Sequence, residues 1–199
     1  MIKRFTPIIA LVALCWLVFL VNNLLWHGQF NQYGVIPRHV GSLPGIIWAP
    51  FLHGSFKHLV ANTVPLLIFG GIICARSKAE FGMIAVAGIL LTGGLTWLFA
   101  RTASHIGASG LIFCFFGYIA SLACFRRSFG ALVLSTVCVL VYGGMLKGIF
   151  PTSTPISWES HAAGLVSGIV LAWLTSKVNP REDKEVKPAE LTEATERRG

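Results

Sequence analysis

Six long apolar stretches, almost free of charge, dominate this chain of 199 residues. Each holds 17 to 20 residues, and Glu159, at the rim of the last stretch, is the only acidic or basic residue in any of them. A helix needs about 20 mostly apolar residues to cross the hydrocarbon core of a bilayer. The stretches are therefore predicted to be six membrane-spanning helices, over residues 7–25, 59–75, 81–100, 107–125, 129–146 and 158–176.

The composition excludes a soluble domain. Charged residues make up 12% of the chain, about half of the roughly 25% that soluble domains carry. The net charge of +8 does not indicate a nucleic-acid partner, because the basic residues stand in pairs beside apolar segments rather than on one basic face. The predicted fold class is all-α, a polytopic membrane bundle whose partner is the lipid bilayer.

The basic residues also predict the direction of each helix. Short loops that carry Lys and Arg tend to stay in the cytoplasm. A cytoplasmic N-terminus puts twelve basic residues on the inner side and four on the outer side. We therefore expect both termini in the cytoplasm, in a bacterial inner membrane, with the second, fourth and sixth spans starting at the outer face.

Two segments lie outside the spans. Residues 26–57 are rich in aromatic and apolar groups, which favours an outer loop lying in the membrane interface. Residues 177–199 are charged and have almost no large apolar side chains, which is typical of a disordered tail. We therefore divide the chain into a membrane domain over 1–176, which includes the outer loop, and a cytoplasmic tail over 177–199.

Four polar side chains stand where spans begin at the outer face. His58 and Asn62 open the second span, Ser109 the fourth and His161 the sixth. Taken singly, each has a structural interpretation, because Ser and His also form hydrogen bonds between spanning helices. Together they are predicted at one depth. Polar groups that gather inside a membrane mark a functional site.

Close packing of the fourth and sixth spans would bring Ser109 and His161 together. Small residues recur on both helices, which lets backbones approach closely: Gly110, Cys114, Gly117 and Ser121 on one, and Gly164, Gly168 and Ala172 on the other. A neutral imidazole can take the proton of a serine hydroxyl as that hydroxyl attacks a carbonyl. The prediction is a catalytic dyad, with Ser109 as the nucleophile and His161 as the base.

Other residues around this dyad have predicted supporting roles. The backbone N–H of Ser109, the Asn62 amide and the His58 ring are candidates to stabilise an oxyanion. Gly107 and Gly110 would permit a tight backbone, and Phe113 could offer its ring to the imidazole. Glu159 lies on another face of its helix from His161, so packing rather than an acid is expected to orient the base.

These residues resemble the rhomboid intramembrane serine proteases in order and spacing. The resemblance rests on three motifs, namely His53 with His58-Leu59-Val60-Ala61-Asn62, Gly107-Ala108-Ser109-Gly110, and His161-Ala162-Ala163-Gly164-Leu165-Val166-Ser167-Gly168. It implies the six-helix rhomboid fold, a Ser109 nucleophile with a His161 base, oxyanion help from His58 and Asn62, and cleavage of membrane-spanning proteins near the outer surface. It also implies a small residue just before the scissile bond.

The sequence departs from the family pattern at three places. Phe113 stands where the family often has Tyr, Trp48-Ala49 replaces the usual Trp-Arg pair, and Gly70-Gly71 lacks the Glu that often follows. Two other functions stay open, a catalytically silent rhomboid-like binder of spanning helices and a small channel or transporter. No metal or cofactor is predicted, because His27, His39 and His105 are expected in loops or at the interface and the five Cys lack ligand spacing.

Overall fold

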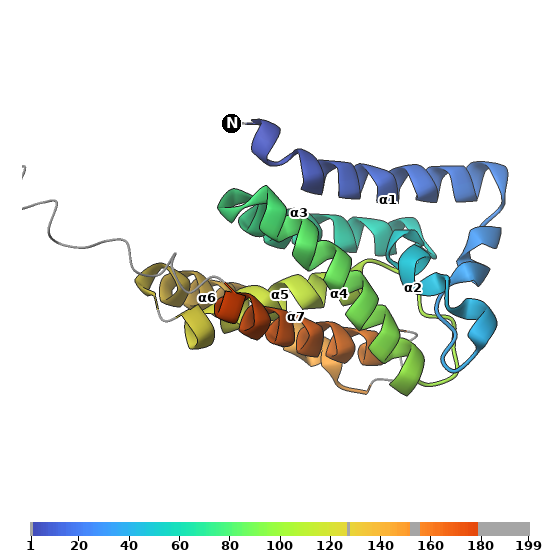
Figure 1. The fold of residues 1–199 in the computed structure, drawn as a ribbon. Coiled ribbons are helices and arrows are strands. Elements are labelled where there is room, and N and C mark those ends of the chain that lie inside the picture. The colour runs from blue at the N-terminus through green and yellow to red at the C-terminus, as the bar shows by residue number, and fades with distance from the viewer. Residues whose placement is uncertain (1, 127, 152–155, 179–199) are drawn as a thin grey trace, which may run out of the picture.

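The computed structural model describes residues 2–126, 128–151 and 156–178. Within these ranges the chain is helical, and β-structure is limited to an isolated antiparallel bridge between Val35 and His105. Figure 1 shows the long helices side by side, with the segment that joins α1 to α3 gathered at one end of the bundle. The predicted disorder of the tail concerns residues that, from 179 onward, lie outside the described part of the chain.

All six predicted spans are helical. The long helices are α1 (Thr6–Leu25), α3 (Phe56–Arg76), α4 (Lys78–Phe99), α5 (Ser109–Arg126), α6 (Phe129–Tyr142), which continues as the 3-10 helix η5 (Gly143–Ile149), and α7 (Trp158–Val178). Among the described residues, five of these segments are long and apolar enough to cross a membrane, from α1 through α6 with η5. The sixth predicted span is α7, whose 21 residues extend about 30 Å, the thickness of the hydrocarbon core. The chain is an integral membrane protein.

Local capping moves several helix ends from their predicted positions. The α3 helix begins at Phe56 rather than at Leu59, because the Ser55 hydroxyl accepts the N–H of His58. The α5 helix begins at Ser109 rather than at Gly107, because Gly107 has a φ of +112°, outside the right-handed helical region. At the other end of the chain, α7 continues through Val178, two residues beyond the boundary predicted for the tail.

The outer loop is made of short helical turns. It contains η2 (Gln29–Tyr33), η3 (Val40–Ser42), α2 (Gly45–Trp48) and η4 (Ala49–Phe51). Val40, Ile47 and Trp48 leave 51% to 71% of their surface exposed. Arg38 ties the loop to the end of α4 by donating to the carbonyl oxygens of Leu98 and Ala100. The loop is thus fixed to the bundle while it presents large apolar side chains outward.

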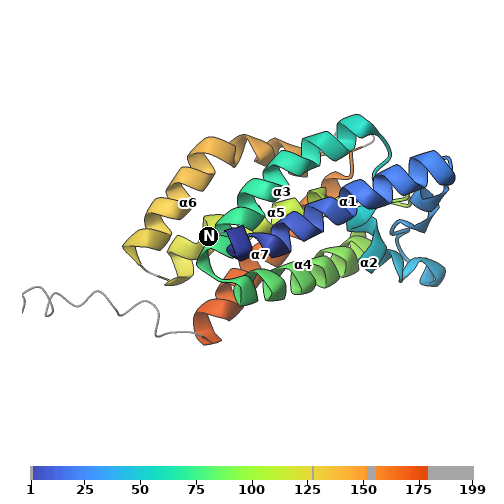
Figure 2. The same cartoon turned by 90° about the horizontal axis from the view of Figure 1, so that it is seen from above.

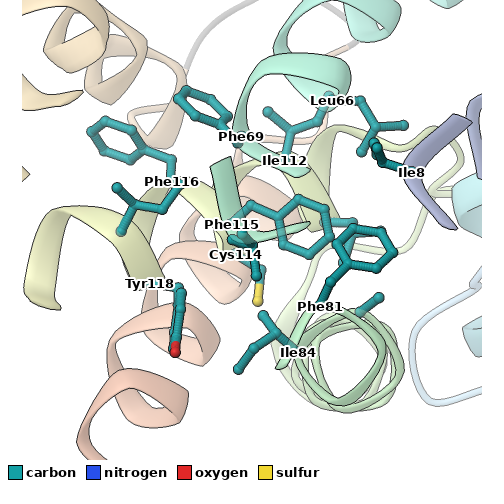
Figure 3. Close-up of a cluster of buried hydrophobic side chains, with 14 of the residues drawn as sticks. Ile8, Leu66, Phe69, Phe81, Ile84, Ile112, Cys114, Phe115, Phe116 and Tyr118 are labelled. Carbon is teal, nitrogen blue, oxygen red and sulfur yellow. The ribbon is translucent and has the colours of Figure 1, made fainter. Parts of the chain in front are cut away.

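The α5 helix forms the centre of the bundle. In its spanning window 67% of the residues are buried, against 17% for the span formed by α6 and η5. Figure 2 shows α6 along one edge of the molecule, away from α1 and α4. Aromatic side chains of α5 fill the space toward its neighbours, as the pairs Phe116–Phe69 and Phe115–Phe81 in Figure 3 illustrate. Side chains carried by α5 are therefore held in a packed environment.

Charged groups gather at the end of the bundle opposite the outer loop. Glu80 accepts hydrogen bonds from the Tyr118 hydroxyl at 2.5 Å and from Arg126 at 3.2 Å, and pairs with Arg76 at 3.4 Å. Arg4 donates to the Arg76 carbonyl oxygen at 2.9 Å. The N-terminal segment, the α3–α4 connection and the end of α5 therefore meet at this end.

Candidate active site

Ser109 and His161 meet at the end of the bundle nearest the outer loop. Ser109 is the first residue of α5 and His161 the fourth of α7. The distance from Ser109 Oγ to His161 Nε2 is 2.8 Å, a hydrogen bond between side chains that are 52 positions apart in the chain. His161 is 7% exposed, and Ser109 is half-buried. A hydroxyl and an imidazole are thus in contact at a site that is only partly buried.

The other side of the imidazole is held by a backbone carbonyl group. His161 Nδ1 lies 2.9 Å from the carbonyl oxygen of Gly148, in η5. A carbonyl oxygen can only accept, so in the neutral ring Nδ1 carries the proton and Nε2 is free to accept the Ser109 O–H. The Phe113 ring stacks on the imidazole with centroids 4.3 Å apart and planes 10° apart. Tautomer and ring plane are therefore both set without a carboxylate.

Close approach of α5 and α7 makes the Ser109–His161 contact possible. A Cβ atom added to Gly164 would overlap the Gly110 carbonyl oxygen, and one added to Gly168 would overlap that of Cys114. A Cβ on Gly117 would lie 2.6 Å from the Leu165 carbonyl oxygen. The prediction that small residues let these two helices pack tightly is confirmed.

Asn62 is oriented by a histidine of the outer loop. His53 Nδ1 lies 3.3 Å from the Phe51 carbonyl oxygen, and His53 Nε2 lies 3.1 Å from Asn62 Nδ2. With the proton on Nδ1, Nε2 accepts one N–H of the Asn62 amide, and the second N–H remains available. Burial, with a smaller effect from nearby His58, lowers the pKa of His53 from 6.5 to about 4, so its ring is neutral near pH 7.

Gly107 faces the predicted oxyanion donors from the loop before Ser109. A Cβ at this position would lie 2.6 Å from His58 Cε1 and 3.5 Å from Asn62 Nδ2. Two constraints therefore favour glycine, the positive φ and the space that His58 occupies. Because Ser109 opens α5, its backbone N–H is also among those without a partner inside the helix. The loop, α3 and the start of α5 bring the predicted donors to one region.

Two cavities lie near this end of the bundle. A cavity of about 30 Å³ lies beside Gly110, lined by Thr92 and Thr96 of α4 and by Ser160. A larger one of about 670 Å³ lies between α1 and the outer loop and does not include the dyad. In the described ranges, no three His, Cys, Asp or Glu side chains form a cluster that could hold a metal ion.

The structure places every predicted site residue at this end of the bundle. It also brings the Gly148 carbonyl oxygen to His161, a contact that sequence reasoning missed. Every residue type has such an oxygen, so no signal in the sequence distinguishes it. The fold of η5 alone brings it to His161.

Similarity to known proteins identifies the family of this chain. The model of the rhomboid domain matches residues 40–178. The chain belongs to the rhomboid family. An uncharacterized protein of Mycobacterium tuberculosis is 38% identical over 181 residues, which cover 86% of this chain and 75% of that protein. The protein named "Putative rhomboid protease YdcA" from Bacillus subtilis is 27% identical over 180 residues, which cover 85% of this chain and 86% of that protein.

The part of the chain that matches the rhomboid domain includes the candidate active site. The rhomboid match begins in the outer loop and ends with α7, so it includes all three motifs on which the resemblance rests. An uncharacterized protein of Mycobacterium leprae is similar as well, with 34% identity over 178 residues that cover 85% of this chain and 70% of that protein.

Proposed function

We propose that this rhomboid-family protein is a serine endopeptidase that cleaves membrane-spanning proteins near the outer face of the membrane. The observation that carries the proposal is the 2.8 Å contact between Ser109 Oγ and His161 Nε2, in which the imidazole is oriented by Gly148 and Phe113. A serine hydroxyl is a weak nucleophile by itself and becomes effective beside a positioned base.

The geometry supports a mechanism in two steps. In the first, Ser109 Oγ attacks the peptide carbonyl carbon while His161 Nε2 takes the hydroxyl proton. The resulting imidazolium gives this proton to the leaving amine as the C–N bond breaks, which leaves an acyl group on Ser109. In the second step a water molecule, deprotonated by His161, attacks the acyl group and restores the serine.

The negative oxygen formed in each step needs hydrogen-bond donors. The backbone N–H of Ser109, the second N–H of the Asn62 amide and the His58 ring are the donors that we assign. The N-terminus of α5 adds partial positive charge at the same place. In this assignment His53 does not touch the substrate, because its role is to hold the Asn62 amide.

We infer that the substrate unwinds before it is cut. Peptide carbonyl groups inside a spanning helix are engaged in internal hydrogen bonds. A segment containing Gly, Pro or other weak helix formers near the outer interface would therefore be preferred. We also infer an inner-membrane location with both termini in the cytoplasm, because Arg4, Arg76 and Arg126 lie at the end of the bundle opposite the dyad. The membrane domain in this proposal is residues 1–176 and the cytoplasmic tail residues 177–199, the first two of which complete the last turn of α7.

The test is cleavage of a model spanning substrate by the purified protein in liposomes. Ser109→Ala and His161→Ala should each abolish cleavage, and Ser109→Ala should also abolish covalent labelling by a fluorophosphonate. Ser121→Ala is the matched control, because it removes a hydroxyl from the same helix that, in the described part of the chain, bonds only to the α5 backbone at Gly117 and Tyr118. Binding of the substrate without cleavage by the wild type would instead indicate a catalytically silent binder of spanning helices.

A further inference from the structure

The loop that precedes the nucleophile is tied to two neighbouring segments. Toward the outer loop, His105 and Val35 exchange backbone hydrogen bonds, and the Gly107 N–H donates to the Ala49 carbonyl oxygen at 2.8 Å. Toward α7, Arg101 donates to the Ile156 carbonyl oxygen at 3.0 Å. In Figure 1 this yellow-green loop between α4 and α5 runs beside the blue outer loop. Through these hydrogen bonds the loop connects the outer loop to the segment that leads into α7.

His105 lies in this loop, one of the two places expected from the sequence, and is buried inside the junction. Its side chain is 4% exposed. His105 Nε2 lies 3.0 Å from the Arg101 carbonyl oxygen, and His105 Nδ1 lies 2.5 Å from Ser157 Oγ. A carbonyl oxygen only accepts, so Nε2 donates and Nδ1 accepts the Ser157 O–H in the neutral ring. Every polar atom of this imidazole is thus engaged.

Ser157 is hydrogen-bonded both to His105 and to the first turn of α7. Its hydroxyl accepts the N–H of Ser160 at 3.3 Å, and its carbonyl oxygen accepts the N–H of His161 at 3.2 Å. Ser157 therefore caps the first turn of α7, the turn that carries His161. The His105–Ser157 bond links the loop four residues before Ser109 to the cap four residues before His161.

We propose that His105 is a positioning residue that sets the separation between Ser109 and His161 through its hydrogen bond to Ser157. The inference rests on the proposed function, since it assigns a role in that reaction. His105 touches neither reacting group, because its two ring nitrogens are used by Arg101 and Ser157. It acts on the distance between a nucleophile and a base that belong to different helices. A misplacement of about 1 Å between reacting groups lowers rates by about 100-fold.

Two substitutions separate the two hydrogen bonds of the ring. In His105→Asn the amide oxygen can take the place of Nδ1 and accept the Ser157 O–H, while the bond to Arg101 is lost. In His105→Gln the amide nitrogen can take the place of Nε2 and keep the Arg101 bond, while the acceptor for Ser157 is lost. Both variants leave one buried polar group unpaired, so a role limited to stability predicts that both lose activity equally.

The proposal predicts unequal effects in the liposome cleavage assay. His105→Gln should lower kcat by about 10-fold or more with KM changed by less than about 2-fold, whereas His105→Asn should stay within about 3-fold of the wild-type kcat. His27→Asn is the matched control, because His27 is exposed in the outer loop and has a positive φ that Asn tolerates. Thermal unfolding in detergent should show equal midpoints for the Asn and Gln variants.

Variants at Ser157 test the same bond from its other end. Ser157→Ala should lower kcat as much as His105→Gln does, whereas Ser157→Thr, which keeps the hydroxyl, should retain the wild-type kcat. The combined His105→Gln/Ser157→Ala variant should be no slower than either single variant. Equal kcat values for His105→Asn and His105→Gln, or additive losses in the double variant, would overturn the positioning role alone. A wild type no more active than Ser109→Ala would overturn the proposed function, and this inference with it.

Discussion

Replacing Gly164 by Ala tests whether the fit between α5 and α7 controls both stability and chemistry. The added Cβ would overlap the Gly110 carbonyl oxygen and lie 3.0 Å from the Gly110 carbonyl carbon and 3.1 Å from Phe113 Cβ. Real Cβ atoms essentially never come closer than 3.0 Å to a heavy atom outside their own stretch of chain. Because backbone atoms block the new methyl group, no side chain can turn away to make room. The two helices must separate by a distance on the order of 1 Å.

The expected cost follows from that separation. Overpacking of a close-packed interior destabilises a protein by about 1–3 kcal/mol, so the free energy of unfolding should fall by about 2 kcal/mol in Gly164→Ala. Gly164 lies one turn after His161, so the separation also lengthens the 2.8 Å contact to Ser109. A displacement of about 1 Å predicts a loss of about 100-fold in kcat.

The assay measures unfolding in detergent and cleavage in liposomes on the same preparations. Gly71→Ala is the control, because an added Cβ there meets no atom within 4 Å. An unobstructed Gly→Ala change inside a helix such as α3 stabilises the protein by about 1 kcal/mol, and kcat should be unchanged. If Gly164→Ala kept wild-type kcat and stability, the close approach of α5 and α7 would not be what holds the dyad together.

Variants at three further positions test other parts of the structure. The pKa of His53 is about 4 in the folded protein, against 6.5 in the unfolded chain. The free energy of unfolding that depends on the neutral His53 ring is therefore fully present above about pH 6.5 and decreases as the pH falls to 4. Between about pH 7 and pH 4 the wild type should lose about 3 kcal/mol more of its free energy of unfolding than His53→Gln. Tyr118→Phe removes a hydrogen bond to Glu80 and should lower the free energy of unfolding by about 2 kcal/mol without changing kcat. Phe113→Leu should lower kcat about 5-fold because the ring stacked on His161 is lost. Phe113→Tyr keeps the aromatic ring and should retain the wild-type kcat.

The spans could be predicted because lipid imposes a simple rule on the sequence. Each of the six apolar stretches is helical in the structure. The errors lie at the ends, where a single side chain decides. The Ser55 and Ser77 hydroxyls cap α3 and α4 and start both helices three residues before the predicted positions. Hydropathy contains no information on capping, so these ends could not follow from it.

The site was predictable to the extent that its members are unusual for a membrane interior. Ser109, His161, His58 and Asn62 stand out as polar groups among apolar ones, and their common depth follows from the helix directions. The roles of His105 and Ser157 could not be predicted in this way, because both lie in connections whose path the periodicity of spans does not define. Only the folded loops show that the two side chains meet.

Among the residues that the structure describes, no carboxylate pairs with His161, and this follows from where the site lies. An acid that paired with the imidazole would have to lose its hydration in the bundle, which costs several kcal/mol per ion. The Gly148 carbonyl oxygen accepts a hydrogen bond from the Nδ1–H without carrying a full charge, so the tautomer is fixed at a smaller desolvation cost. In the proposed reaction His161 becomes an imidazolium, and the face of Phe113, 4.3 Å away, can then stabilise the positive charge by about 0.5–2 kcal/mol. The one nearby carboxylate, Glu159, is instead paired with Arg101 at 3.5 Å, which places its charge on the loop before the nucleophile.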